Sequence, residues 1–305
     1  MKAGTNLEKV LDGGRFAVTA EAGPPKGTSA RVIQRKAELL RSCCDAVNVT
    51  DNQTAIVRLC SLAGCVLLKQ VGVEPVMQVV VRDRNRIALQ SDILGAIALG
   101  IGNILCLSGD HQKFGNHPTA KGVFDIDSIQ LIQMVKTMRD EKKFLCGEDV
   151  SGEVPVFIGA VENPYADPFE LRVRRLAKKV KAGADFIQTQ AVYDVPKFAS
   201  WMQMVTEQGL DTKVHILAGI IPLRSAGMAR YMRDYVSGVS IPAELFTRME
   251  GAKSAKEEGV KIAIEIIEQV KEVPGVHGVH VMAVGWEEIV PEIVSKAGLL
   301  PRPML

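Results

Sequence analysis

The sequence lacks a net charge of either sign, because 37 lysines and arginines against 35 aspartates and glutamates leave a formal charge of +2 over 305 residues. No basic run is dense enough to follow a phosphate backbone, so we expect no nucleic-acid partner. Long apolar runs are missing too. The longest uncharged stretch, residues 93–109, is too short to cross a bilayer and is broken by glycines. We therefore predict no membrane-spanning segment.

The sequence also lacks a secretory signal and a disulfide framework. Residues 1–14 hold no continuous apolar stretch and include Glu8 and Asp12, which predicts a cytoplasmic protein. The six cysteines fall mostly within apolar helix or strand patterns, where a thiol behaves as a small buried hydrophobe. With 47% apolar and 24% charged residues, the composition is that of a globular protein with a large core.

What the sequence does contain is a repeated unit in which an apolar, β-rich run is followed by a loop and then by helix-like spacing. The first four runs end about 30 residues apart, and so do the fifth to the seventh, which is the length of one strand-loop-helix unit. Eight units predict an α/β fold of the closed (β/α)8 TIM-barrel type, formed by residues 1–305 as a single domain. The runs end near Glu21, Thr50, Val81, Asp110, Val161, Gln190, Ile220 and Val284.

Helical spacing between these runs predicts where the helices begin and end. Thr54 is expected to cap a helix that continues to Lys69, and Asp167 to cap another. Asp127 or Ser128 should cap the helix that follows the long loop after Asp110, and residues 243–271 read as one further helical stretch. Since loops at the carboxyl ends of barrel strands carry binding residues, that long loop is expected to cover a ligand.

Polar residues at the strand ends are the candidates for chemistry, and Glu21 is the first of them. It ends a buried run and is followed directly by a loop with two consecutive prolines, which orders its backbone. A single strand-end acid is often only a helix cap. However, polar residues from several units would converge at one mouth of a barrel. These residues are Glu21, Thr50, Gln78, Asp110 and Gln190.

Several other chemistries lack their signature. There is no lysine at a strand end for a Schiff base, no GxSxG elbow and no Walker loop, and the GIGN at residues 100–103 precedes a strand instead of following one. His111 and His117 lie in a loop where a histidine is usually solvated. His277 and His280 would face opposite sides of an extended segment. We predict no protein-bound metal.

Six short segments of the sequence form a recognisable series. They are TAEAGPP (19–25), VNVTDN (47–52), LSGD (107–110), ENP (162–164), KAGADFIQTQAVYDV (181–195) and AGIIPL (218–223). In their order and spacing they resemble the methylenetetrahydrofolate reductase family. This resemblance implies an eight-stranded barrel that holds a flavin at the strand carboxyl ends. It also implies a hydride transfer from reduced flavin to 5,10-methylenetetrahydrofolate, which gives 5-methyltetrahydrofolate.

The resemblance also implies roles for individual residues. Glu21 falls on the family's general acid, Asp110 on an aspartate beside both flavin and folate, and Gln190 on a glutamine that contacts the pterin. Gln78 and Ser108 stand where the family commonly has His and Arg, so FAD is favoured but FMN stays open. The positions that align with flavin contacts are Thr50, Gln78, Ser108, Gly109, Asp110, Phe124 and Lys179.

The electron-input side departs from the family pattern. Many members stack a nicotinamide on an aromatic near the seventh strand, where this chain has Arg224, Ser225 and Ala226. The chain resembles the shorter reductases of anaerobic one-carbon metabolism, which can take electrons through a partner subunit instead of directly from NADH. The resemblance therefore implies a hetero- or homo-oligomer and leaves NADH as direct donor open. Two alternatives stay open: a flavin- or pterin-binding electron-relay subunit, and a cofactor-free barrel of the pterin-dependent methyltransferase type.

Overall fold

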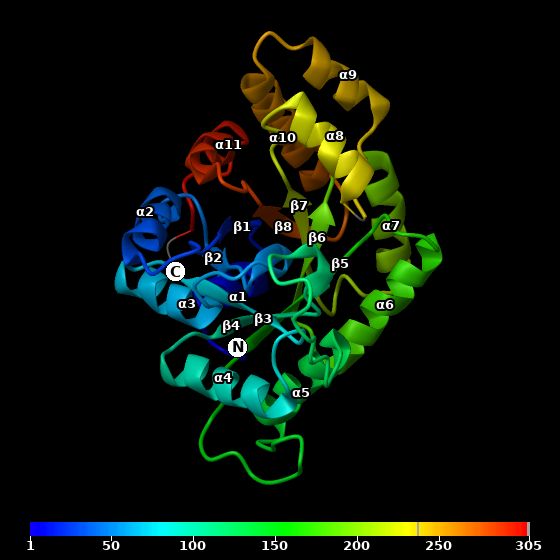
Figure 1. Cartoon of the computed structure of the whole chain (residues 1–305). Coiled ribbons are helices and arrows are strands. Elements are labelled where there is room, and N and C mark those ends of the chain that lie inside the picture. The colour runs from blue at the N-terminus through cyan, green and yellow to red at the C-terminus, as the bar shows by residue number, and fades with distance from the viewer. Residues whose placement is uncertain (237, 304–305) are drawn as a thin grey trace.

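Eight parallel strands form a closed barrel in sequence order, with β8 paired to β1 (Figure 1). The computed structural model describes residues 1–236 and 238–303. The barrel confirms the fold predicted from the repeated unit. The strands are β1 (Ala17–Ala22), β2 (Ala46–Val49), β3 (Pro75–Val80), β4 (Asn103–Leu107), β5 (Phe157–Glu162), β6 (Phe186–Ala191), β7 (His215–Ile220) and β8 (Val276–Val281).

Helices surround the barrel, and α8, α9 and α10 extend it at the top of the view in Figure 1. None of the helices in the described part of the chain is long and apolar enough to span a membrane. The α-helices are α1 (Asn6–Asp12), α2 (Ala30–Leu40), α3 (Ser61–Gln70), α4 (Arg86–Ala98), α5 (Ser128–Asp140), α6 (Phe169–Ala182), α7 (Val195–Glu207), α8 (Ala226–Tyr235), α9 (Ala243–Gly251), α10 (Ala255–Lys271) and α11 (Val290–Lys296). Short 3-10 turns are η1 (Gln53–Ala55), η2 (Gln112–Phe114) and η3 (Glu287–Ile289).

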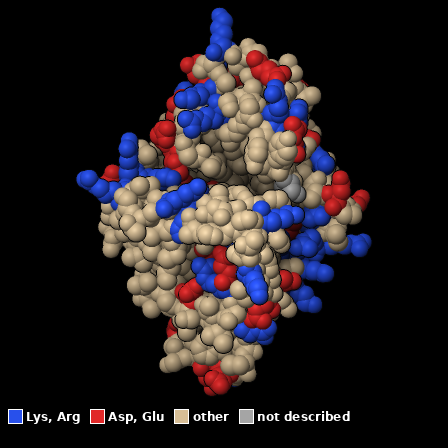
Figure 2. All heavy atoms as spheres, viewed as in Figure 1, with Lys and Arg blue, Asp and Glu red and all other residues tan. Residues whose placement is uncertain are grey.

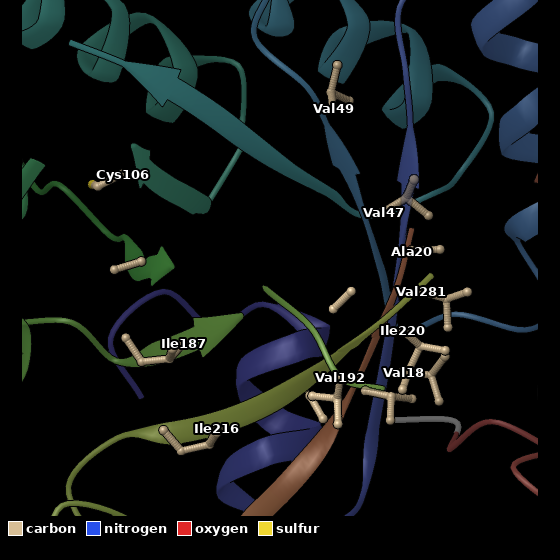
Figure 3. Close-up of a cluster of buried hydrophobic side chains, with 14 of the residues drawn as sticks. Val18, Ala20, Val47, Val49, Cys106, Ile187, Val192, Ile216, Ile220 and Val281 are labelled. Carbon is tan, nitrogen blue, oxygen red and sulfur yellow. The ribbon is translucent and has the colours of Figure 1, made fainter. Parts of the chain in front are cut away.

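The strands are buried on both faces, which is why they read as continuous apolar runs. Alternate residues point outward and pack against the helices in one large core cluster. Part of this cluster is drawn in Figure 3, with side chains that include Val18, Ala20, Val47, Ile187 and Val281.

The inward-facing residues change character along the barrel axis. At the amino-terminal end, α1 closes the barrel with Leu7, Val10 and Leu11, which pack with Phe157 and Phe186 in a second apolar cluster. The two phenylalanine rings stack with centroids 5.1 Å apart. Further along, the interior becomes polar, so the apolar plug supports a polar site above it.

Three of the predicted helix boundaries were wrong or incomplete. The helix expected from Thr54 begins only at Ser61, because Thr54 itself has a φ of 58° and lies in a 3-10 turn. Asp167 does not cap α6, whose N-cap position is Pro168. The stretch expected over residues 243–271 is two helices, α9 and α10. By contrast, Asp127, one of the two predicted caps, begins α5 in a full capping box.

A register shift between β6 and β7 alters the barrel wall next to Gln190. The Thr189 hydroxyl accepts a hydrogen bond from the Gly219 amide at 2.9 Å and donates one to the Gln190 carbonyl at 2.9 Å. A Cβ on Gly219 would lie 2.3 Å from the Thr189 carbonyl oxygen, so only glycine fits here. Such an irregularity redirects a side chain at the barrel rim.

Candidate active site

A cavity of about 420 Å³ opens at the carboxyl ends of the strands. On the face drawn in Figure 2, acidic and basic side chains are interspersed over the surface instead of forming a patch of one sign. The cavity brings together most of the residues that the sequence singled out, although they come from four different strands or their exit loops and from α6. Those residues are Glu21, Gln78, Ser108, Gly109, Asp110, Lys179 and Gln190.

Glu21 lies in β1, in reach of Gln78 on β3. The Gln78 side-chain amide donates a hydrogen bond of 3.3 Å to one Glu21 carboxyl oxygen. Burial raises the pKa of Glu21 to about 7, and the negative charge of Glu287 acts in the same direction; the Gln78 hydrogen bond and Lys36 oppose the rise. Lys36 is itself paired with Glu287 at 2.5 Å, so the Glu287 carboxylate largely neutralises its charge. Glu21 can therefore hold or release a proton near neutral pH.

Asp110 follows β4 and joins the loops after three strands. Its carboxylate accepts the Thr54 amide at 3.0 Å, while its carbonyl accepts a bond of 2.9 Å from the buried guanidinium of Arg82. The preceding Gly109 has a φ of 82°, a conformation that favours glycine. The exposed Asp110 carboxylate is thus held at the cavity rim by backbone contacts.

Lys179 lies on α6 and is only 5% exposed. Its ammonium group is 2.7 Å from a carboxylate oxygen of Glu162 and also bonds to the Val161 carbonyl. Burial lowers the pKa of Lys179, and the nearby charge of Glu162 opposes that shift. The pair lines the cavity with its charges already neutralised, so Lys179 is a weaker anion ligand than an unpaired lysine would be.

Two arginines on the same face of α6 also line the cavity. Arg172 donates to the carbonyls of Ala166 and Asp167, both at 3.0 Å, and so fixes the loop after β5. Arg175 is exposed and makes no hydrogen bond or ion pair with the residues that the structure describes. The side of α6 that carries these two arginines therefore reaches the cavity.

Two predicted flavin contacts do not line the cavity. Thr50 is 1% exposed, and its hydroxyl has no hydrogen-bond partner among the described residues. Phe124 is 44% exposed on the loop after β4, with a φ of 42°. The roles that the resemblance implies for Thr50, Phe124 and the other site residues remain predictions.

The sequence analysis missed the polar floor of the cavity. Gln188 of β6 and His280 of β8 border the cavity from below and connect to Thr19 and Asn48. The available signal was the two-residue period, since Thr19 and Gln188 precede Glu21 and Gln190 by two positions and therefore face the same side. Within the described residues, no three His, Cys, Asp or Glu side chains gather as metal ligands would.

Fold and site together define a (β/α)8 barrel with a ligand cavity at the carboxyl ends of its strands. The sequence profile of the methylenetetrahydrofolate reductase family matches residues 6–298, and the chain belongs to that family. This finding confirms the resemblance seen in the sequence.

Individual relatives agree with this membership. Methylenetetrahydrofolate reductase 2 of Schizosaccharomyces pombe is 29% identical over 215 residues, which are 67% of this chain and 32% of that protein. The 5,10-methylenetetrahydrofolate reductase of Escherichia coli is 24% identical over 206 residues, which are 66% of this chain and 62% of that protein. The chain thus matches about a third of the Schizosaccharomyces pombe protein.

Among solved structures, a Clostridium thermocellum protein described as binding two copies of 5-methyl-5,6,7,8-tetrahydrofolic acid superposes with a TM-score of 0.68. The superposition covers 95% of this chain and 97% of that one at 14% sequence identity. At this identity the likeness concerns the fold.

Proposed function

We propose that this protein reduces 5,10-methylenetetrahydrofolate to 5-methyltetrahydrofolate, with reduced flavin as the hydride donor. The observation that carries the proposal is Glu21, a carboxyl group whose pKa is raised to about 7 at the strand ends of a barrel of this family. Opening of the folate imidazolidine ring requires a proton on the departing nitrogen. An acid that titrates near neutrality is suited to give it.

The residues around Glu21 orient the proton donor, bind the folate and set the charge at the cavity rim. Gln78 donates to the Glu21 carboxyl and thereby orients the proton donor. In this proposal Gln190, which lies beside the irregularity between β6 and β7 and lines the cavity, holds the pterin ring, and Asp110 supplies a negative charge at the rim. Bound flavin would supply the hydride; the protein residues position the folate and hold the proton.

The residues present fit a flavin with a phosphate group. Arg175 offers, at the rim of the cavity, a guanidinium group that makes no hydrogen bond or ion pair with the described residues. Lys179 fits less well as a phosphate ligand because Glu162 already neutralises it. On these grounds we assign the flavin phosphate to Arg175, with FAD favoured by the family and FMN as the alternative.

Electron supply from a partner subunit is part of the proposal. At the position after β7 where the resemblance would place a stacking aromatic, the Ser225 hydroxyl accepts the Met228 amide and caps α8, while Arg224 reaches towards the Gly285 carbonyl. Neither side chain offers an aromatic face to a nicotinamide. Anaerobic bleaching of the flavin by NADH alone, at a rate matching turnover, would contradict the need for a partner.

The test is a single-turnover experiment on protein reconstituted with FAD or FMN and reduced with dithionite under anaerobic conditions. We expect methylenetetrahydrofolate to restore the oxidised flavin spectrum. In Glu21→Gln the rate should fall by about 10²–10⁴-fold while flavin affinity is kept, because only the proton donor is lost.

The same experiment separates the alternatives. Bound flavin that folate never re-oxidises would replace the reductase by an electron-relay subunit. Failure to bind FAD or FMN, together with retained folate binding, would replace it by a cofactor-free barrel of the methyltransferase type.

A further inference from the structure

The floor of the cavity holds a chain of hydrogen bonds that the proposed reaction does not use. The side-chain amides of Asn48 and Gln188 bond to each other twice, at 2.7 and 3.1 Å, across the barrel between β2 and β6. The remaining amide hydrogen of Gln188 points to the Thr19 hydroxyl at 3.2 Å. Thr19 in turn lies 2.9 Å from Nδ1 of His280. All four residues are at most 3% exposed.

The lengths of these bonds favour one of the two neutral tautomers of His280. The Thr19 hydroxyl accepts from Gln188 and has one hydrogen to donate. Two acceptors lie in reach of that hydrogen, His280 Nδ1 at 2.9 Å and the Val279 carbonyl at 3.4 Å, and the shorter distance favours donation to Nδ1. Nδ1 is then an acceptor without a proton. In a neutral imidazole the single proton must therefore sit on Nε2.

Two further observations concern the ring itself. Burial lowers the pKa of His280 to about 3, so the ring is neutral at physiological pH. Nε2 makes no hydrogen bond to the described residues, yet it is not fully buried. His280 lines the cavity. The Nε2–H group thus borders the space that a ligand would fill.

We infer that His280 is a specificity-determining residue whose Nε2–H, fixed by the chain Asn48–Gln188–Thr19, donates a hydrogen bond to a neutral acceptor on the ligand at the cavity floor. The fitting acceptor is a ring nitrogen or carbonyl oxygen on the pyrimidine-type edge of a fused heteroaromatic ring. Both a flavin and a reduced folate carry such an edge. The identity of the ligand rests on the proposed function, whereas the fixed tautomer does not.

The tautomer is tested directly by ¹⁵N-histidine NMR on the intact protein. We expect the His280 signals, assigned with His280→Gln, to show a proton on Nε2 and no titration between pH 5 and 8. Thr19→Val removes the hydroxyl at nearly constant shape and should abolish the preference for this tautomer. A proton on Nδ1 in the unaltered protein would overturn the inference without touching the proposed function.

The ligand contact is tested by titrating FMN into flavin-free protein and tetrahydrofolate into flavin-loaded protein. His280→Leu should weaken one of the two by about tenfold or more, whereas His280→Gln, whose side-chain amide can place a donor near Nε2, should restore most of the affinity. The arm that responds identifies the ligand. Equal affinities of all variants for both ligands, or binding of neither ligand, would overturn the contact. His277→Gln, on the same strand but outside the cavity lining, is the control and should bind like the unaltered protein.

Discussion

Two glutamates at the mouth of the barrel are held in opposite electrostatic environments. Glu162 lies 2.7 Å from the Lys179 ammonium group. Glu21 has only a weak bond of 3.3 Å from an uncharged amide, and burial raises its pKa to about 7. An ion-paired carboxylate is a structural group, whereas a carboxyl group with a raised pKa is suited to proton transfer. The capacity for proton transfer therefore lies with Glu21, the glutamate that has no ion-pair partner among the described residues, and not with Glu162.

Glu21→Gln should stabilise the protein at alkaline pH. The raised pKa means that ionisation is penalised in the folded state: the penalty is absent below about pH 4.5, grows up to the folded pKa of about 7 and is constant above it. We expect a gain in the free energy of unfolding of up to about 3 kcal/mol at pH 8 and less than about 1 kcal/mol at pH 5. Urea denaturation at both pH values measures it; an equal change at the two would contradict the assigned pKa.

Glu162→Gln should destabilise the protein strongly. It leaves the buried ammonium of Lys179 without its counter-charge, which typically costs about 3–5 kcal/mol. The double variant Glu162→Gln, Lys179→Met should recover most of that loss. As a control, Glu292→Gln breaks the exposed pair with Lys296 and should change stability by less than about 0.5 kcal/mol. Similar losses from the two single variants would show that the buried pair is no special contact.

At the scale of elements, α6 shows how one helix serves two environments. Arg172, Arg175 and Lys179 follow helical spacing along the face that lines the cavity, whereas Arg174 and Lys178 do not line it. All five are basic residues within one short segment of the sequence. Only the packing of α6 against the barrel distinguishes them.

This division predicts the effect of charge removal on flavin binding. Arg175→Ala should weaken FMN or FAD by about tenfold while leaving riboflavin, which lacks the phosphate, unchanged. Arg174→Ala keeps the same helix and removes a similar charge outside the cavity, so its affinities should match the unaltered protein. Fluorescence titration with the three flavins measures this. An equal loss for riboflavin would contradict a phosphate contact.

Elements were predictable from the sequence to the extent that local spacing determines them. The eight strands have buried faces inside and outside, so their apolar runs stood out, and Asp127 was recognisable as a cap. The prediction of a helix from Thr54 was wrong because the Thr54 amide bonds to the carboxylate of Asp110, 56 residues away, in a turn with a non-helical backbone. Local spacing does not show such a contact. The Glu162 and Lys179 pair and the link from Thr19 to His280 likewise join residues that are distant in sequence.

At the scale of the whole molecule, closure of the barrel by β1 and β8 makes the ends of the chain depend on each other. Helix α1 adds to this by filling the amino-terminal end with Leu7, Val10 and Leu11. Because the polar floor and the cavity lie above this plug, the site depends on the complete barrel. The sequence could predict the convergence of Glu21, Asp110 and Gln190, since closure alone brings strand ends together.

The single domain predicted for residues 1–305 implies one cooperative unfolding transition. Leu7→Ala should lower the free energy of unfolding by about 2–5 kcal/mol and shift the whole transition. Calorimetry and circular dichroism should report the same midpoint for the unaltered chain and for the variant. Two separate transitions, or loss of only part of the signal, would contradict a single cooperative unit.

The central claim is that Glu21 gives the proton that allows a hydride to reach methylenetetrahydrofolate. The most direct measurement is the rate at which this folate re-oxidises the dithionite-reduced, flavin-loaded protein between pH 5.5 and 9. We expect the rate to fall above about pH 7 as Glu21 ionises, and to be at least about 100-fold lower in Glu21→Gln between pH 5.5 and 7. A rate that is flat through pH 7, or equal in the variant, would contradict the account.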